Sequence, residues 1–210
     1  MAITLQKGQG VSLKKTENDL SEVTIGLGWD VAEQTGFLNK LFNGPAPDYD
    51  LDAVAFLLGE NGKVASFTSS EKLKGSDIIF YNNKEHPSGA IWLTGDNLTG
   101  AGEAGGDDEQ IIIKLEQLPS KYRKILLIVQ IYEGIKRKQN FANVKNAFIR
   151  AVDKKNIEMC RFDLSGNSSY ADCHSMVFAE IERQGSEWKF TAIGKPYQTD
   201  RFLDILKEYI

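Results

Sequence analysis

The feature that most constrains the fold is the division of the apolar residues into many short segments. The segments are rich in β-branched and aromatic residues, and some alternate strictly, as Trp188, Phe190 and Ala192 do with their neighbours. Turn-forming residues separate them, for example at 60–63 and 183–187. Many short strands without alternating helices are typical of a β-sandwich, so we expect two mainly antiparallel sheets. The predicted strands are 23–29, 51–59, 77–81, 90–93, 110–115, 124–132, 146–153, 157–164, 174–183 and 187–194.

Helical patterns are few. Residues 199–210 carry apolar side chains at helical intervals, which predicts a short C-terminal helix. A capping pattern and first turn predict a helix at 118–125, and a short helical insertion is expected at 35–44. The chain has 210 residues without a tandem repeat or an interdomain linker, so we expect one domain over residues 1–210.

The net charge is only −4, but it is unevenly distributed along the chain. Residues 1–113 contain 8 Lys and Arg against 17 Asp and Glu, whereas residues 114–210 contain 17 against 12. The acidic balance disfavours a nucleic-acid partner, because binding to nucleic acid needs a cationic surface. It favours a cation or a basic partner.

The cysteines and the N-terminal sequence indicate the compartment. Cys160 and Cys173 are too few for a structural zinc site, and they favour a reducing cytosol, with a single disulfide as the open alternative. The first fifteen residues contain no apolar signal-peptide core. The longest apolar run, 125–132, is too short to span a bilayer. We therefore expect a cytoplasmic protein without a transmembrane segment.

Acidic residues concentrate in a glycine-rich stretch at 93–113, which has five carboxylates and neither lysine nor arginine. Because like charges repel, this stretch is either a solvated connector or a place where a cation binds. A second acidic motif, Asp48, Asp50 and Asp52, alternates directly before an apolar strand. Carboxylates on one face of a strand lie about 7 Å apart and repel by about 0.6 kcal/mol in water. Alternatively, Asp48 belongs to a turn and only two acids share a face.

The candidate ligands are hard oxygen donors. Neither acidic stretch forms an EF-hand; in the second motif, Ala53 and Gly59 occupy the positions of the required glycine and glutamate. Carboxylates and Asn carbonyls without His or Cys select calcium or magnesium, and irregular loops suit the flexible coordination of calcium. Turn formation and solubility are the alternative explanation. Asp30 could equally accept a backbone hydrogen bond, and Asn82 or Asn83 could form a turn.

Eight motifs, taken in order, resemble the TerD family of tellurite- and stress-resistance proteins: GLGWD, DYDLDA, IIFYNN, TGDNLTG, GDDEQI, QNFANVKNAFIR, RFDLS and EWKFTAIG. The resemblance runs from about residue 3 to 195. It implies a β-sandwich that binds two calcium ions through acidic loops. It also implies a role in bacterial resistance to tellurite, other chemical stresses, phage and colicins, together with other resistance proteins in membrane-associated complexes. The metal ligands that it implies are Asp30, Asp48, Asp50, Asp52, Asp77, Asn82, Asn83, Asp96, Asn97, Asp107, Asp108 and Glu109.

The chain departs from the family pattern in three places. The loop before GDDEQI is longer than usual, and Ala101 replaces its first acid, which leaves the role of Glu103 open. The segment 31–47 is also longer, so it could add a partner surface or cover the site. The C-terminal segment 194–210 matches least well.

The sequence favours a non-catalytic interaction module that is ordered by calcium. It contains no GxSxG, HExxH or P-loop, and the acidic motifs contain no histidine. We expect His86 and His174 at the surface or satisfied by a partner, and Cys160 in the core. The basic run 136–138 is predicted to be a solvated loop, with contact to anionic lipid or a partner as the alternative. The alternative function is a metal-dependent phosphoester hydrolase, or a nucleotide-type ligand binder, that uses the same acidic cluster.

Overall fold

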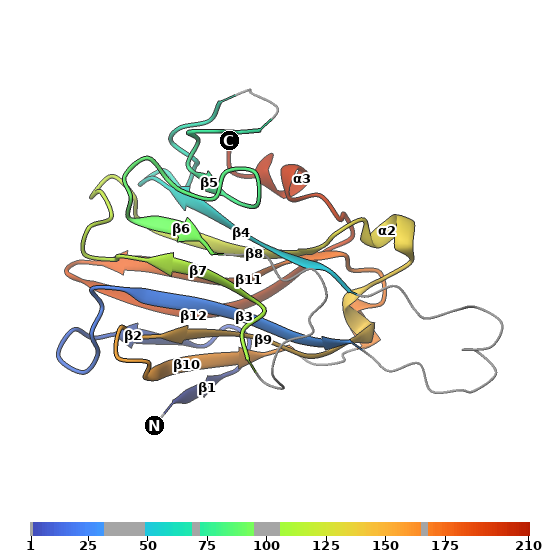
Figure 1. Cartoon of the computed structure of the whole chain (residues 1–210), viewed down its shortest axis with the longest axis horizontal. Coiled ribbons are helices and arrows are strands. Elements are labelled where there is room, and N and C mark those ends of the chain that lie inside the picture. Colours follow the sequence, from blue (N-terminus) through green and yellow to red (C-terminus); the bar gives the residue numbers. More distant parts are fainter. Residues whose placement is uncertain (1, 32–48, 69–71, 95–105, 165–167) are drawn as a thin grey trace.

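The strands form two sheets that pack face to face (Figure 1). The computed structural model describes residues 2–31, 49–68, 72–94, 106–164 and 168–210. In these residues, sheet A has the order β1 (Ile3–Leu5), β10 (Glu158–Asp163), β9 (Val144–Val152), β3 (Val23–Val31), β7 (Glu109–Ile113) and β6 (Ile91–Leu93). Sheet B has the order β2 (Gly10–Leu13), β12 (Glu187–Tyr197), β11 (Ser175–Gln184), β8 (Lys124–Ile131), β4 (Leu51–Leu58) and β5 (Ile78–Ile79).

The pairing confirms the predicted mainly antiparallel β-sandwich. Among the described strands, β1 and β10 pair in parallel, and the other neighbours pair antiparallel. Described helices are short: α2 (Gly134–Arg137), α3 (Phe202–Leu206) and two 3-10 turns, Phe141–Asn143 and Ser168–Tyr170. No helix in the described part of the chain is long and apolar enough to cross a membrane.

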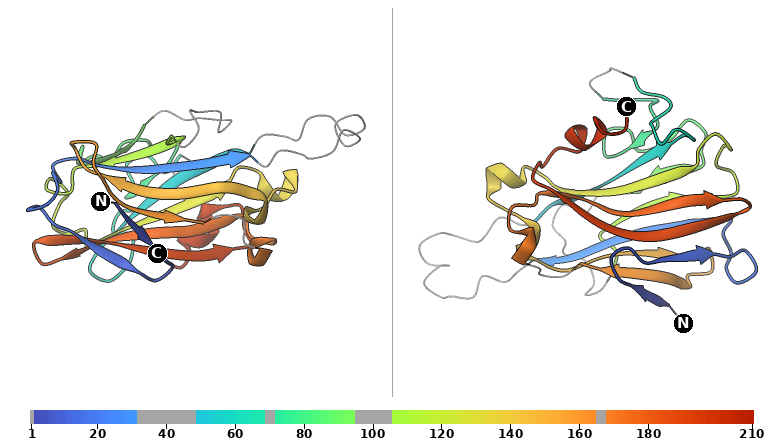
Figure 2. Two further views of the ribbon diagram at one scale, coloured as in Figure 1. Left: turned by 90° about the horizontal axis from the view of Figure 1, so that it is seen from below. Right: turned by 180° about the vertical axis from the view of Figure 1, so that it is seen from behind.

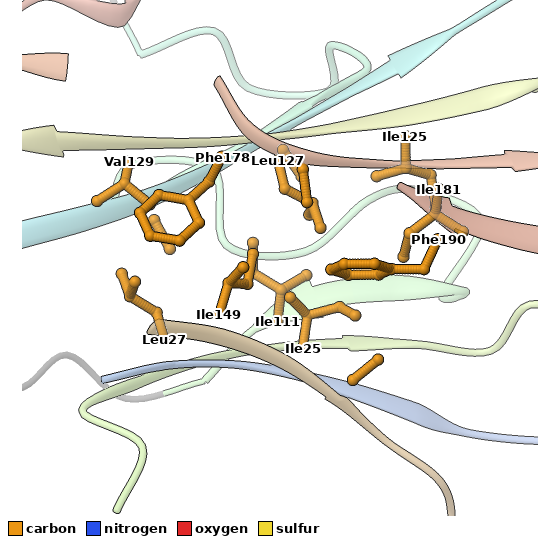
Figure 3. Packing of buried hydrophobic residues seen from close by; sticks show 14 of the residues in the cluster. Ile25, Leu27, Ile111, Ile125, Leu127, Val129, Ile149, Phe178, Ile181 and Phe190 are labelled. Atoms are coloured by element: carbon orange, nitrogen blue, oxygen red, sulfur yellow. The ribbon is translucent and has the colours of Figure 1, made fainter. Parts of the chain in front are cut away.

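Strand alternation builds the core between the sheets. Figure 3 shows Ile25 and Leu27 of sheet A facing Leu127 and Phe190 of sheet B. These side chains are almost fully buried, because every second residue of a strand points to the same face. Removal of this apolar surface from water is the main force that holds the sheets together.

A second apolar cluster covers the outer face of sheet B. Helix α3 lies against this face (Figures 1 and 2), and its Phe202 and Ile205 pack among residues that include Phe56 of β4 and Ile128 of β8. Strands β4 and β8 are therefore buried on both faces along most of their length. This double burial explains why their sequences are continuous apolar runs rather than alternating ones.

One helix prediction is wrong, and the C-terminal helix is confirmed but shorter than predicted. The predicted helix at 118–125 is wrong: the segment forms turns, closed by a hydrogen bond from Tyr122 N to Pro119 O of 3.0 Å, and the Tyr122 side chain is buried. The C-terminal helix ends at Leu206, because Tyr209 O then accepts a hydrogen bond from Val64 N at 2.7 Å. The predicted insertion at 35–44 lies outside the described residues.

The central position of Phe190 makes it a test of the core. Truncation of this fully buried ring in Phe190→Ala should lower the free energy of unfolding by about 3–5 kcal/mol, because it leaves a cavity between the sheets. The neighbouring Lys189→Ala, on the other face of β12, should change it by less than about 0.5 kcal/mol. Urea unfolding followed by fluorescence measures both variants. Equal effects would contradict the assignment of faces.

Candidate metal centre at one end of the sandwich

Three strand ends of both sheets meet at one end of the molecule. There β3 ends and β7 begins, with Leu27 paired to Glu109, and β4 of sheet B begins. The indole Nε1 of Trp29 donates a hydrogen bond of 3.2 Å to the carbonyl oxygen of Tyr49, two residues before β4. These contacts place two of the predicted acidic motifs, GDDEQI and DYDLDA, at the same end (Figure 1, right).

Asp108 and Glu109 are buried, and their carboxylates accept hydrogen bonds from backbone N–H groups at this end. Oδ2 of Asp108 accepts a hydrogen bond of 2.9 Å from Trp29 N in β3. Glu109 points between the sheets, because it alternates with Ile111 in the core, and its Oε2 accepts a hydrogen bond from Ala53 N in β4. Two consecutive side chains therefore fix the ends of strands from both sheets.

Asp107 turns to the outer face of sheet A. Its Oδ1 accepts a hydrogen bond of 2.7 Å from Arg150 Nε, and its Oδ2 accepts one of 3.1 Å from Gln110 Nε2. Gly26 makes room for this carboxylate, since a Cβ atom there would lie 2.2 Å from it. Arg150 also contacts Glu158 at 3.1 Å. The charge of Asp107 is therefore compensated by Arg150, which anchors the acidic segment to β9.

The DYDLDA motif is divided between two environments. Asp50 lies directly before β4, and its carbonyl oxygen accepts a hydrogen bond of 2.8 Å from Tyr132 N. Asp52 is buried on the outer face of sheet B, where its Oδ2 accepts a hydrogen bond of 2.9 Å from Gln130 Nε2. The side chain of Asp52 therefore lies on the outer face of sheet B, whereas Glu109 contacts β4 from the inner face, between the two sheets.

Asp77 lies toward the other end of β4, since its carbonyl oxygen accepts a hydrogen bond from Leu57 N. Its buried carboxylate is fully used within the fold. Oδ1 contacts Tyr122 OH at 2.6 Å and His86 Nε2 at 3.0 Å, and Oδ2 accepts a hydrogen bond of 2.8 Å from Ser66 N. Burial alone would raise the pKa of Asp77, but these three hydrogen bonds outweigh it and hold the pKa below its usual value.

The two asparagines of IIFYNN lie near Asp77 and not at the acidic end. Asn83 is buried, and its Nδ2 donates to the carbonyl oxygen of Ile78 at 2.6 Å. Asn82 is exposed in the turn that Asn83 N closes with Phe80 O at 2.9 Å. The structure therefore separates Asp77, Asn82 and Asn83 from Asp108 and gives them turn and packing roles.

The remaining predicted ligands are only partly visible. Asp30 lies in β3, where its backbone pairs with Lys145, but its side chain is outside the described part. Asp48, Asp96 and Asn97 lie outside the described residues. Within the residues that the structure describes, no group of three or more His, Cys, Asp or Glu side chains could hold a metal ion.

Two partners of these acids were not identified from the sequence, although His86 was expected at the surface or satisfied by a partner. His86 is buried and links Asp77 to Ser88, whose Oγ lies 2.7 Å from its Nδ1. The contact between His86 and Asp77 was not predictable, because these two residues come together only through the fold. The position of Arg150 was easier to predict, since the alternation in 146–153 already places its side chain on the face opposite the core.

Comparison with known proteins relates this arrangement to one family. A family model described as the TerD domain matches residues 1–209. Similar proteins include "Tellurium resistance protein TerX" of Serratia marcescens, 54% identical over all of both chains, and "Stress response protein SCP2" of Bacillus subtilis, 44% identical over all of both chains. A similar crystal structure is that of a homologue of telluride resistance protein TerD from Streptomyces coelicolor. Its TM-score is 0.61 at 19% identity, covering 87% of this chain and 94% of that one, which supports the fold alone.

The Asp107–Arg150 pair should stabilise the fold. Arg150→Met should lower the free energy of unfolding by about 2–3 kcal/mol, because it leaves a carboxylate that is 2% exposed without its cation. This expected loss of stability is smaller than for a fully buried ion pair, since the Arg150 side chain is 26% exposed. Adding Asp107→Asn to Arg150→Met should recover part of the loss in urea unfolding. A further loss in the double variant would contradict this account.

The Asp77 network should make stability depend on pH. Asp77 contributes stability above its unfolded-state pKa and loses it as the pH falls through its lower folded-state pKa. Tyr122→Phe removes one hydrogen bond to the carboxylate, so it should cost about 1–3 kcal/mol at neutral pH and shift acid unfolding to higher pH. Urea unfolding measured between neutral and acidic pH tests this. An unchanged acid transition would contradict the network's role.

Proposed function

The chain belongs to the TerD domain family, and we propose that it is a calcium-binding, non-catalytic interaction module in bacterial resistance to tellurite and other chemical stress. The names of its relatives refer to tellurium resistance and stress response, and none names a catalytic activity. The observation that carries the calcium proposal is the position of Asp108 and Glu109. These residues are consecutive in the chain, and their carboxylates bind backbone N–H groups at strand ends of both sheets.

The donor chemistry at this end fits calcium. We place in the proposed site the carboxylates of Asp50, Asp108 and Glu109 and, from outside the described side chains, Asp30, Asp48, Asp96 and Asn97. All are oxygen donors, which calcium prefers, and calcium accepts six to eight of them in irregular geometry. We propose two ions, since this number of carboxylates exceeds what one ion neutralises. We leave out Asp107, which Arg150 neutralises, and Asp77, whose two oxygens are engaged.

The proposed mechanism follows from what these carboxylates already hold. Calcium, when bound, supplies the positive charge that reduces repulsion between them. Asp108 and Glu109 hold Trp29 and Ala53 through backbone hydrogen bonds, so their positions set the ends of β3 and β4. A change in the net charge at this end therefore changes the surface that the two sheets present together. We propose that other stress-resistance proteins, in a membrane-associated complex, recognise this surface.

The hydrolase alternative gains no support from the described residues. A general base for phosphoester hydrolysis must lie within hydrogen-bond reach of the attacking water. Of the two histidines, His86 belongs to the Asp77 network, and the Nδ1 of His174 contacts the carbonyl oxygen of Gln139 at 2.6 Å. Neither contacts Asp108 or Glu109.

Calorimetric titration of chelator-treated protein tests the proposal. We expect calcium to bind, to raise the melting temperature, and to bind more tightly than magnesium, because binding to the folded state alone stabilises it. Asp108→Asn should weaken calcium binding by about tenfold or more, since it removes a charged ligand. Glu187→Gln removes an equal charge from the exposed first residue of β12 and should leave binding unchanged.

The outcomes separate the alternatives clearly. Absence of calcium heat and of a thermal shift would restrict the family inference to the fold. Turnover of a generic phosphoester with magnesium or manganese, lost on Asp108→Asn, would instead favour the hydrolase. Equal weakening by Asp108→Asn and Glu187→Gln would mean that calcium responds to net charge and not to this site.

A further inference from the structure

A serine, a histidine and an aspartate are joined by hydrogen bonds where the chain passes from β5 to β6. Oγ of Ser88 lies 2.7 Å from Nδ1 of His86, and Nε2 of His86 lies 3.0 Å from Oδ1 of Asp77. A hydroxyl, an imidazole and a carboxylate in this order form the arrangement that activates a serine for nucleophilic attack. The proposed calcium centre does not include these residues, since Asp77 lies toward the other end of β4.

The hydrogen bonds around His86 fix which ring nitrogen carries the proton. The backbone N–H of Ser88 donates to Nδ1 at 3.1 Å, so Nδ1 is an acceptor. The ring proton is then on Nε2, which lies 3.0 Å from the carboxylate of Asp77 and 3.1 Å from the hydroxyl oxygen of Tyr122. Nδ1 is therefore the basic nitrogen, and it lies within hydrogen-bond reach of Ser88 Oγ.

Asp77 supports this base in two ways. Its hydrogen bond to Nε2 orients the imidazole ring so that Nδ1 faces the serine. Burial alone would raise the pKa of Asp77, but its hydrogen bonds lower it, so the carboxylate is charged at neutral pH. A charged carboxylate stabilises the imidazolium that forms when His86 accepts a proton. Asp77 and His86 are both buried, so solvent screens this interaction little.

Ser88 itself is exposed, so a reagent in solution reaches its hydroxyl group. Its Oγ also accepts a hydrogen bond of 3.2 Å from Ala90 N. An N–H group directed at Oγ stabilises negative charge as the hydroxyl loses its proton. The hydrogen bond of 2.9 Å from Gly89 N to His86 O closes the turn that holds these groups together.

The same turn limits the electrophile. A carbonyl oxygen under attack needs N–H donors, but the N–H groups of Ser88, Gly89 and Ala90 are all engaged within the turn. Attack then depends on the leaving group, so acyl donors whose leaving group is a weak base are favoured. An acyl-serine has a strongly basic alkoxide as its leaving group, so its hydrolysis is slow without such donors. The acylated serine therefore accumulates.

From this geometry we propose that Ser88 is a site of covalent acylation by a small activated acyl donor, a thioester or an acyl phosphate. Ser88 Oγ attacks the carbonyl carbon and forms a C–O bond, while His86 Nδ1 takes the hydroxyl proton. The bond between the carbonyl carbon and the thiolate or phosphate breaks, and His86 passes the proton to that leaving group. One acyl group is transferred to each protein molecule, so this step involves no turnover and does not rest on calcium.

The test treats the full-length protein with p-nitrophenyl acetate and follows acetylation of single residues by peptide mass spectrometry. Ser186, exposed in the turn between β11 and β12, is the internal control in the same reaction. We expect Ser88 to be acetylated about 100-fold faster than Ser186, because a positioned general base contributes about 10²–10⁴-fold. In urea the two serines should react at similar rates, since unfolding removes the contacts of His86.

Two histidine variants locate the base. His86→Gln retains an amide N–H that can donate to Asp77 but has no basic nitrogen beside Ser88, so it should slow acetylation of Ser88 about 100-fold. His174→Gln is the matched control, because the Nδ1 of His174 contacts the carbonyl oxygen of Gln139, and it should leave the rate unchanged. The comparison of Ser88 with Ser186 in the parent protein keeps the test valid if His86→Gln disturbs the fold.

Acetyl phosphate and a small acetyl thioester, S-acetyl-N-acetylcysteamine, then distinguish the two donor classes. Faster modification of Ser88 by one of them assigns that class, and modification by neither would overturn the proposal.

Equal rates at Ser88 and Ser186 in the folded protein, or an unchanged rate in a folded His86→Gln variant, would also overturn it. Continued release of p-nitrophenolate beyond one equivalent, lost in Ser88→Ala, would contradict both this single transfer and the non-catalytic function. The calcium titration does not involve Ser88, so failure of the calcium site is distinguishable from failure of this one.

Discussion

A buried carboxylate joins the two sheets at the acidic end of the molecule. Glu109 begins β7 in sheet A, and it accepts a hydrogen bond from Ala53 N in sheet B. Asp108 does the same within sheet A by accepting one from Trp29 N. Buried backbone N–H groups at strand ends need an acceptor, and a missing one would cost about 1–3 kcal/mol. The relative position of β3, β4 and β7 therefore depends on two consecutive acidic residues, and these cannot be replaced freely by apolar ones.

The opposite end of β4 uses the same device. There Asp77 collects hydrogen bonds from Tyr122, His86 and a backbone N–H, so its charge is balanced by hydrogen bonds within the fold. Arg150 balances the charge of Asp107 with its own full positive charge. Several acids in the negatively charged first half of the chain thus have structural partners. The carboxylates at the end near Asp108 are the ones for which we propose a cation.

The sequence predicted the sandwich well, because strand alternation and turn residues are local signals. It also predicted a strand at 110–115, directly after Asp108 and Glu109, and the observed β7 begins at Glu109. The partners of the acids were not predictable, because they come from strands that pair only in the folded state. Asp107 and Arg150 are 43 residues apart, and Asp77 and Tyr122 are 45 apart. The false helix at 118–125 has the same cause, because burial of Tyr122 beside Asp77 decides the conformation there.

Strand β4 links the proposed cation site to helix α3 through adjacent residues. At Ala53 its backbone meets Glu109, and at Asp52 its side chain meets Gln130, which in turn holds the N-terminal residue of α3, Phe202. The strand is buried on both faces, so it cannot shift at one residue without moving its neighbour. Glu109, Gln130 and Phe202 are therefore all tied to one short segment of β4. The proposed cation at the acidic end would therefore act on a strand whose residues are also tied to β8 and α3.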